Sequence, residues 1–276
     1  MFICVDPDCD GMTSAAIFIN YLYKLFPSYV INKVKYGLPK GKQHGVNVNN
    51  IPLGTSLVVA IDSSSSSFEE TKELKNKNIE VIVLDHHESE HVDENAIIVN
   101  NQLCDYPTKS LSGAGIAFKF CSYLDSLLSE DKRYADELLD LAALGMIADM
   151  VSLKDFETRR IITKGLAAPK NIFLSAMIDK NSYSLGSDLT PMGVAFYIAP
   201  YVNATIRSGT QKEKMILFEA MLDHKAHNKV PSTKRGCAGQ EEFLVHQAVR
   251  NCTNIKNRQT KSRDKNYEIV KEIIET

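Results

Sequence analysis

The sequence lacks the features of a secreted or membrane-spanning protein. Every apolar run in its 276 residues is too short or too interrupted to cross a bilayer. Phe2-Ile3-Cys4-Val5 leads straight into an acidic segment, without the basic leader and small-residue cleavage site of a signal peptide. The six cysteines show no C-x-x-C spacing, which favours reduced thiols. We therefore expect a cytoplasmic protein that does not interact with membranes.

The sequence also lacks a large net charge, although its charge is unevenly distributed. The formal net charge is −2, but residues 201–276 carry 14 basic and 9 acidic side chains, an excess of 5 positive charges that leaves −7 for residues 1–200. The basic part is the first place to look for contact with an anionic polymer. A solvated helix surface explains the same composition equally well.

Strand and helix patterns alternate over residues 1–155. Short apolar or alternating segments predict strands over residues 2–5, 29–36, 57–61, 79–84 and 96–99. Helical spacing of apolar residues predicts helices over residues 12–26, 113–128 and 134–148, with a more polar helix over 68–77. The serine run at 63–67 indicates a turn and helix cap, and the Gly- and Asn-rich stretch 37–52 indicates a loop. This alternation predicts an α/β core whose mostly parallel sheet is flanked by helices.

Helical patterns dominate after residue 155, where the strand signal fades. We expect residues 156–237 to form a helical part that completes the domain, with a helix over 158–166. Residues 238–276 predict one long helix that is polar and basic over much of its length.

Four apolar runs each end in potential metal ligands. These are Asp6, Asp8 and Asp10 after residues 2–5, Asp62 after 57–61, Asp85, His86 and His87 at the end of 79–84, and Asp149 after 144–148. Sites in open α/β sheets are built at the carboxyl ends of the strands, so we expect one dinuclear metal centre there. At the end of an otherwise apolar helix, Asp149 would be costly to bury without a cation.

The first acidic cluster has the spacing of a cation site. In an extended chain Asp6, Asp8 and Asp10 project from one side, and three like charges so close are unfavourable without a cation. The pattern D-x-D-x-D-G also opens an EF-hand calcium loop. That loop needs a bidentate Glu at its twelfth position, where this sequence has Ile17, so the calcium-loop interpretation is rejected.

The two adjacent imidazoles point in different directions, so that one can bind a metal while the other faces a substrate. A single histidine or aspartate after a strand is more often structural, and the prediction therefore depends on all four segments together. Oxygen ligands with one imidazole and no thiolate suit Mn²⁺ or Mg²⁺ better than Zn²⁺. Two such ions would activate a water and stabilise the leaving oxygen in the hydrolysis of a phosphate ester or anhydride.

The same four segments match known motifs. They are Asp6-Pro7-Asp8-Cys9-Asp10-Gly11, the isolated Asp62, Asp85-His86-His87, and Leu144-Gly145-Met146-Ile147-Ala148-Asp149. Together they resemble motifs one to four of the DHH phosphoesterase superfamily, and within it the RecJ-like single-strand-specific exonucleases. Residues 112–119 are similar to the family's glycine-rich helix start, and residues 200–209 resemble its phosphate-binding segment. The resemblance covers roughly residues 2–260.

The resemblance implies a DHH-type fold and phosphodiester hydrolysis with two Mn²⁺ or Mg²⁺ ions. One ion would take Asp6, Asp8 and Asp62, and the other Asp10, Asp62, His86 and Asp149, so that Asp62 bridges them. His87 would contact the scissile phosphate and Asp85 would orient the histidine pair. The implied substrate-binding residues are Ser112, Gly113, Asn203 and Arg207. The implied substrate is single-stranded nucleic acid, DNA rather than RNA, degraded 5′→3′ to 5′-mononucleotides in DNA repair and recombination.

Departures from the family pattern leave two alternatives open. Cys4 stands where some members have a histidine, which favours the RecJ-like branch, and Thr205-Ile206-Arg207 replaces a more usual Ala-Gly-Arg. No sequence resembling the DHH-associated domain follows the long helix, so we expect either a shortened sequence or a protein partner that completes the substrate site. The alternatives are a phosphodiesterase for short oligonucleotides or cyclic dinucleotides, and a non-catalytic scaffold that binds nucleic acid or a replication partner.

Overall fold

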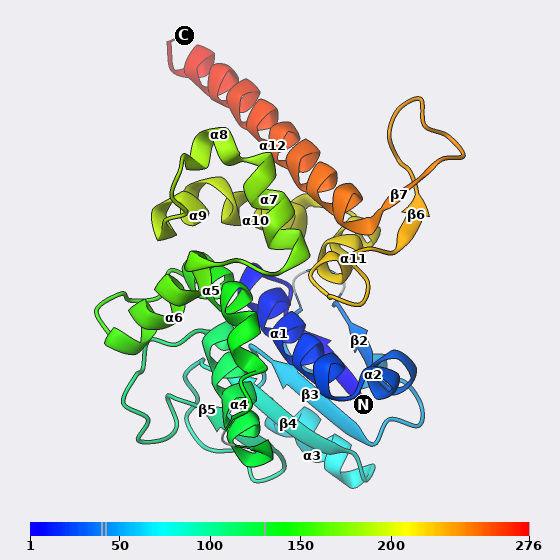
Figure 1. Ribbon diagram of the computed structural model, residues 1–276, viewed down its shortest axis with the longest axis vertical. Coiled ribbons are helices and arrows are strands. Elements are labelled where there is room, and N and C mark those ends of the chain that lie inside the picture. Colours follow the sequence, from blue (N-terminus) through cyan, green and yellow to red (C-terminus); the bar gives the residue numbers. More distant parts are fainter. Residues whose placement is uncertain (40, 42, 130, 276) are drawn as a thin grey trace.

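A five-stranded parallel sheet forms the centre of the N-terminal part of the protein (Figure 1). The computed structural model describes residues 1–39, 41, 43–129 and 131–275. The sheet has the order β2-β1-β3-β4-β5, and every neighbouring pair is parallel. The strands are β1 (Phe2–Val5), β2 (Lys35–Gly37), β3 (Leu57–Ile61), β4 (Glu80–Asp85) and β5 (Ile97–Asn100). The predicted α/β class with a mostly parallel sheet is confirmed.

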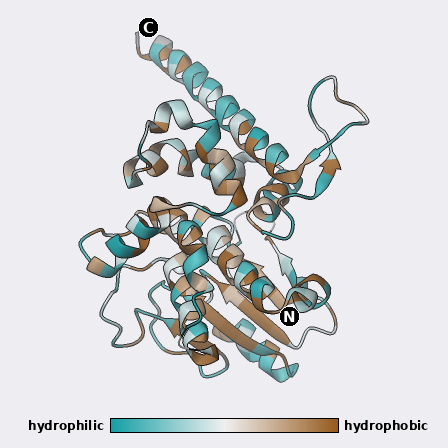
Figure 2. Ribbon diagram, in the orientation of Figure 1, coloured by the Kyte–Doolittle hydropathy of each residue, from teal (hydrophilic) through white to brown (hydrophobic). Residues whose placement is uncertain are grey.

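Helices cover both faces of the sheet and create two apolar cores. Val59 and Ile61 of β3 belong to the larger core, whereas Val58 and Ala60 belong to a smaller core on the other side. Because both faces are buried, the strand is apolar throughout, and Figure 2 shows the central strands as hydrophobic ribbons. The larger core contains α1 (Cys9–Leu25), α4 (Gly113–Leu128) and α5 (Leu139–Ala148), and the smaller core lies under α3 (Phe68–Asn76). Short 3₁₀ helices, η1 (Val48–Asn50) and η2 (Ala135–Leu138), occupy two of the connections.

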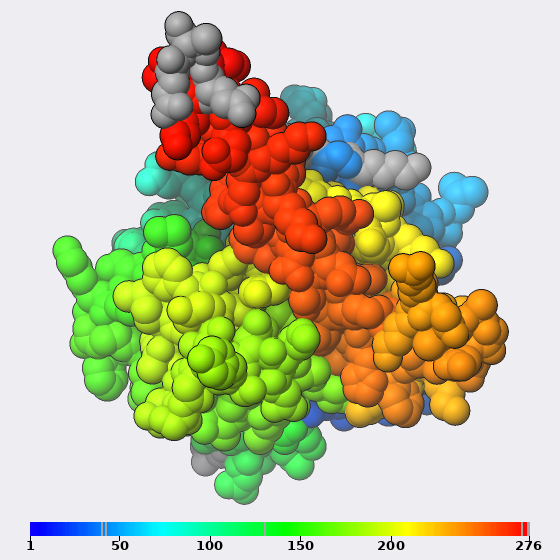
Figure 3. All heavy atoms as spheres, turned by 90° about the horizontal axis from the view of Figure 1, so that it is seen from above, coloured from blue at the N-terminus to red at the C-terminus, as the bar shows by residue number. Residues whose placement is uncertain are grey.

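A helical part lies above the sheet in Figure 1. It contains α6 (Phe156–Ala167), α7 (Ile172–Lys180), α8 (Ser182–Leu185), α9 (Pro191–Tyr197), α10 (Ala199–Ser208), α11 (Gln211–Ala220) and the final helix α12 (Leu244–Glu275). A small hairpin of β6 (Lys229–Pro231) and β7 (Glu241–Phe243) precedes α12. The first turns of α12 are buried as far as Ile255, and the remainder of the helix is largely exposed where it runs to the top of the molecule (Figures 1 and 3).

The structure differs from the predicted elements around α2 and before α12. The strand predicted over residues 29–36 is wrong, because α2 (Pro27–Lys33) occupies most of it and β2 begins only at Lys35. Pro27 stands at the first turn of α2, where its fixed φ favours a helix start. The long helix begins at Leu244 rather than at residue 238, because the unpredicted hairpin precedes it. The division at residues 155 and 237 stays a prediction.

In the described ranges of the chain, no helix is both long enough and apolar enough to cross a bilayer.

Candidate metal centre

The strand order places the predicted ligands at one edge of the sheet. The chain leaves β1 to one side to form β2 and then crosses to the other side to form β3, so the order reverses between β1 and β3. Open α/β sheets bind ligands outside the carboxyl ends of the strands at such a reversal. Asp6 follows β1, Asp62 follows β3, and Asp85 is the last residue of β4.

The first acidic motif spans the turn from β1 into α1. Asp8 is the N-cap of α1 and accepts a hydrogen bond of 2.8 Å from the Gly11 N–H. Asp10 lies inside the first turn of the helix. The expectation that all three carboxylates project from an extended chain is therefore wrong, because α1 begins at Cys9. Because Asp10 lies in the first turn of the helix, its side chain does not project from the same side of the chain as those of Asp6 and Asp8.

The structure brings the six predicted ligands into two adjoining clusters. Ligand atoms of Asp6, Asp8 and Asp62 lie within 4.8 Å of one another, and so do those of Asp10, His86 and Asp149. Nε2 of His86 joins the clusters: it is 3.2 Å from Oδ1 of Asp62, 3.9 Å from Oδ2 of Asp10 and 4.0 Å from Oδ2 of Asp149. A third group, formed by Asp62, His86 and His87, places His87 beside the same carboxylate.

The buried carboxylates fit divalent cations. Oδ2 of Asp10 and Oδ1 of Asp62 are buried and have no hydrogen-bond partner in the described part of the chain. Burial and the charge of Asp149 raise the pKa of Asp10 to about 7, and burial with the charges of Asp10 and Asp8 raises the pKa of Asp62 well above its usual range. Asp62 also has a left-handed backbone with φ of 64°, an unfavourable conformation that aims its side chain into the cluster. Cations here would supply the missing partners and neutralise the crowded charges.

The remaining ligands show the same electrostatic pattern. Burial and the charge of Asp8 raise the pKa of Asp6 to about 6, and the same two causes raise that of Asp149 to about 6. Burial and neighbouring His87 lower the pKa of His86 to about 4. His86 is therefore neutral at pH 7, which is the state in which an imidazole binds a metal.

Asp85 and His87 form a separate hydrogen-bonded pair. Nδ1 of His87 is 2.7 Å from Oδ1 of Asp85, and this hydrogen bond raises the pKa of His87 to about 9 in spite of its partial burial. The Asp85 carboxylate also accepts hydrogen bonds from the N–H groups of His86, His87 and Ser65. Burial alone would raise the pKa of Asp85, but the hydrogen bonds from His87 and Ser65 outweigh it and lower the pKa to about 2. The pair places a charged imidazole beside the metal clusters.

The start of α4 packs directly against the ligands. Oγ of Ser112 donates a hydrogen bond of 2.7 Å to Oδ1 of Asp10, and the Ala114 N–H donates one of 3.1 Å to the same atom. A Cβ atom on Gly113 would overlap the carboxylate of Asp62, with Cγ only 2.5 Å away. Ser112 is fully buried, and its side chain hydrogen-bonds Asp10. The substrate-binding role expected for Ser112 and Gly113 stays a prediction.

The two predicted phosphate-binding residues lie on α10. Arg207 is exposed and Asn203 is partly buried. Nε2 of Gln259, from α12, donates a hydrogen bond of 2.6 Å to Oγ of Ser208 and so ties α12 to the end of α10. The contact of Asn203 and Arg207 with phosphate stays a prediction.

Sequence reasoning missed His44 and the role of the serine run. A pocket of about 460 Å³ beside the clusters is lined by Asp6, His44, Gly45, Asp62, residues 63–67, Asp85 and His87. Ser67 is the N-cap of α3 as expected, but its side chain makes no capping hydrogen bond. The run instead contacts the site, since the Ser65 N–H donates to Asp85. A lone histidine in a glycine-rich loop carries no pattern by which it could be found.

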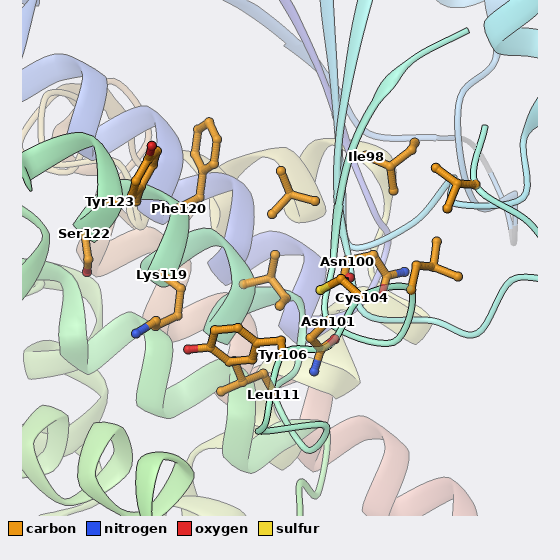
Figure 4. A pocket seen from close by; sticks show the side chains of 14 residues that line it. Ile98, Asn100, Asn101, Cys104, Tyr106, Leu111, Lys119, Phe120, Ser122 and Tyr123 are labelled. Atoms are coloured by element: carbon orange, nitrogen blue, oxygen red, sulfur yellow. The ribbon is translucent and has the colours of Figure 1, made fainter. Parts of the chain in front are cut away.

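A larger cavity of about 690 Å³ lies between β5 and α4, and Figure 4 shows its lining. It is mostly apolar, and none of the six predicted metal ligands lines it. Lys119 on its rim is paired with Glu157 at 2.8 Å. Asn100 connects the two regions, because its Nδ2 donates hydrogen bonds to the His87 carbonyl and to Oγ of Ser65. The cavity lacks the grouped carboxylates of the metal centre.

Comparison with known protein families identifies the family to which the chain belongs. The sequence model of the DHH family, N-terminal domain, matches residues 1–146. The chain belongs to the DHH family. This confirms the resemblance inferred from the four motifs.

Relatives of this DHH chain are named as single-strand-specific exonucleases. It is 40% identical over 261 residues to the putative SPbeta prophage-derived single-strand DNA-specific exonuclease YorK of Bacillus subtilis, over 94% of this chain and 44% of that protein. It is 36% identical over 211 residues to the single-stranded-DNA-specific exonuclease RecJ of Bacillus subtilis, over 73% of this chain and 26% of that protein. The chain thus spans less than half the length of these relatives.

Solved structures share the fold of this DHH chain. A crystal structure of exonuclease RecJ bound to manganese matches 94% of this chain and 62% of that one, with a TM-score of 0.73 and 24% identity. RecJ in complex with Mn²⁺ from Thermus thermophilus matches 94% of this chain and 35% of that one, with a TM-score of 0.69 and 23% identity. At these identities the comparison establishes the DHH fold.

Proposed function

We propose that this DHH chain hydrolyses phosphodiester bonds with two divalent cations, Mn²⁺ or Mg²⁺. The observation that carries the proposal is the position of Asp62, which belongs to one acidic cluster and lies 3.2 Å from His86 of the other. Asp6 and Asp8 would hold one ion with Asp62, and Asp10, His86 and Asp149 would hold the second, with Asp62 shared. When bound, such an ion pair lowers the pKa of an attacking water and neutralises charge on the leaving oxygen.

The chain's own residues prepare the site for a phosphate group. His87 carries a proton at neutral pH, because its pKa is about 9, and it can donate a hydrogen bond to a phosphate oxygen. Asp85 fixes the ring of His87 through Nδ1 and leaves Nε2 to face the substrate. His86 keeps a neutral imidazole whose Nε2 already points at Asp62. His86 would therefore hold a metal ion, and His87 would contact a phosphate.

The substrate we propose is single-stranded DNA, degraded 5′→3′ to 5′-mononucleotides. Relatives with that specificity in their names support DNA over RNA. The excess of positive charge in residues 201–276 suits a polyanion, and Arg207 and Asn203 are the proposed phosphate contacts. Further substrate contacts would come from a protein partner or from a part equivalent to the remaining length of the relatives. We place the activity in the cytoplasm, in DNA repair and recombination.

The test is hydrolysis by the purified chain in the presence of Mn²⁺. A 5′-labelled single strand should release labelled mononucleotide, a blunt duplex should not, and removal of metal with EDTA should stop the reaction. Asp62→Ala should abolish Mn²⁺ binding and turnover together. Cleavage of di- to tetranucleotides only would favour the short-oligonucleotide alternative. Strand binding without any hydrolysis would favour the non-catalytic scaffold and contradict the proposal.

A further inference from the structure

His44 reaches a metal ligand from outside both clusters. Its Nδ1 lies 3.1 Å from Oδ1 and 3.0 Å from Oδ2 of Asp6. The Asp6 side chain is only 3% exposed, whereas that of His44 is 62% exposed. His44 is in none of the groups whose ligand atoms lie within 4.8 Å of one another, so the described geometry makes it a neighbour of a ligand rather than a ligand.

The carboxylate of Asp6 is held by a side chain that lies outside the ligand clusters. Asp8 accepts a hydrogen bond from the Gly11 N–H, and Asp10 accepts two from the start of α4. In the part of the chain that the structure describes, the imidazole of His44 makes the only hydrogen bonds to the Asp6 carboxylate. Loss of the imidazole would leave this buried carboxylate without a hydrogen bond that holds its orientation.

The loop that carries His44 is fixed at both ends. Leu38 is buried in the larger core, and its carbonyl accepts a hydrogen bond of 3.1 Å from Nε2 of Gln211. Val46 is buried in the smaller core, and its N–H donates one of 3.0 Å to Oγ of Ser64. Leu38 and Val46, on either side of His44 in the sequence, are thus each held to one of the two cores. His44 contacts Asp6 from between them in the sequence.

The serine run supports the same loop. Gly45 has a left-handed φ of 80°, and a Cβ there would lie 3.1 Å from Oγ of Ser64 and 3.3 Å from Oγ of Ser67. Ser64 itself has φ of 83°. A left-handed φ is unfavourable for Ser64 but not for Gly45, so glycine suits the position at which the loop contacts the serine run. The serine run therefore packs against the loop that carries His44.

We propose that His44 is a positioning residue for the metal centre. Nδ1 of His44 donates a hydrogen bond to Asp6 and fixes that carboxylate in the orientation that binds the ion shared with Asp8 and Asp62. This proposal rests on the metal site of the proposed function. Removing a residue that hydrogen-bonds a metal ligand typically weakens metal affinity by about 10–100-fold. In the described part of the chain His44 hydrogen-bonds Asp6 and none of Asp10, His86 and Asp149, so an ion held by those three residues should keep its affinity.

The experiment is a Mn²⁺ titration of the whole chain by calorimetry, with electron paramagnetic resonance to detect coupling between two neighbouring ions. His44→Ala should weaken one of the two binding events by about 10–100-fold and leave the other unchanged. His44→Asn should restore most of the affinity, because the Asn amide can donate from nearly the same place as Nδ1. His91→Ala, which removes another exposed histidine, is the matched control and should bind both ions normally.

Three outcomes would overturn the role of His44. Unchanged affinities in His44→Ala would show that Asp6 needs no positioning, and failure of His44→Asn to recover would exclude the hydrogen bond as the cause. Equal loss of both ions would show a general disturbance of the site, which thermal unfolding of the metal-free variant would also report. If the unsubstituted chain bound no Mn²⁺, the proposed function itself would fail.

Discussion

Gly113→Ala tests how closely the protein surrounds the shared carboxylate. A Cβ at this position would overlap Oδ1 of Asp62 and lie 2.5 Å from its Cγ and 2.7 Å from its Cβ. Non-bonded carbon atoms normally stay about 3.5–4.0 Å apart, so the Asp62 side chain would have to move by roughly 1 Å. Its backbone resists that movement, because the Asp62 N–H donates a hydrogen bond of 2.8 Å to the Leu84 carbonyl and φ is already 64°.

The expected effect follows from this displacement. Misplacing a catalytic group by about 1 Å can cost on the order of 100-fold in rate, and overpacking costs about 1–3 kcal/mol of stability. We therefore expect Gly113→Ala to release mononucleotide from a labelled strand about 100-fold more slowly, to bind Mn²⁺ more weakly, and to unfold at lower urea concentration.

The matched control lies two residues further along α4. A Cβ on Gly115 would meet Cδ2 of Leu111 at 3.1 Å, Cβ of Leu111 at 3.2 Å and Sδ of Met146 at 3.5 Å, so the neighbours would have to shift by only a few tenths of an ångström. Alanine is favoured over glycine in a helix by about 1 kcal/mol, which offsets that cost. Gly115→Ala should therefore be nearly neutral. If Gly113→Ala kept both the rate and the Mn²⁺ affinity of the unsubstituted chain, the described packing around Asp62 would be wrong.

Three further predictions concern pH, proton placement and backbone strain. Burial raises the pKa of Asp10 to about 7 and that of Asp6 to about 6 in the metal-free chain, above the ordinary 3.8. These two carboxyls therefore bind more protons in the folded than in the unfolded state between about pH 4 and pH 7, and together they outweigh His86, whose lowered pKa acts in the opposite sense. The free energy of unfolding should fall as the pH rises through that window; urea titrations should show this fall without metal and its loss with saturating Mn²⁺. Asp85→Asn should lower turnover by about 10–100-fold while both ions still bind, because His87 loses the carboxylate that keeps it charged, and an unchanged rate at pH 8 would refute this role. Met150→Gly should raise the free energy of unfolding by about 1 kcal/mol, because Met150 is exposed with φ of 58° after the end of α5, and a lower melting temperature would show that no strain is relieved there.

Local patterns in the sequence predicted the elements that hold the site. The strand expected over residues 57–61 matches β3, and the helix expected over 113–128 matches α4. β3 is buried from Val58 to Ile61 and α4 from Gly113 to Phe118, so burial determines the apolar pattern of these segments. The metal ligands could be predicted from the sequence because each follows a buried apolar segment.

Other features depend on contacts that a local pattern does not contain. Residues 29–36 alternate between apolar and polar residues like a strand. Val30 is nevertheless the only buried residue of α2. Pro27 and the adjoining end of α1 favour a helix here instead of a strand. The strands of the hairpin before α12 are three residues each, and Glu242 is fixed there by Arg250 from the helix. Such short polar strands show no period that could predict them.

The extended-chain interpretation of the first motif and the family resemblance placed Asp10 differently. The motif spacing put Asp10 beside Asp6 and Asp8, whereas the resemblance put it with His86 and Asp149. The start of α1 at Cys9 directs Asp10 toward His86 and Asp149. The order of the strands, which a sequence pattern leaves open, decides which ends lie side by side.

The most direct measurement is anomalous scattering from crystals of the chain soaked in Mn²⁺. Two peaks separated by about 3.5–4 Å are expected, one beside Asp6 and Asp8, one beside Asp10 and Asp149, with Asp62 touching both. A single peak, or two peaks too far apart to share the Asp62 carboxylate, would contradict two-ion hydrolysis at this site.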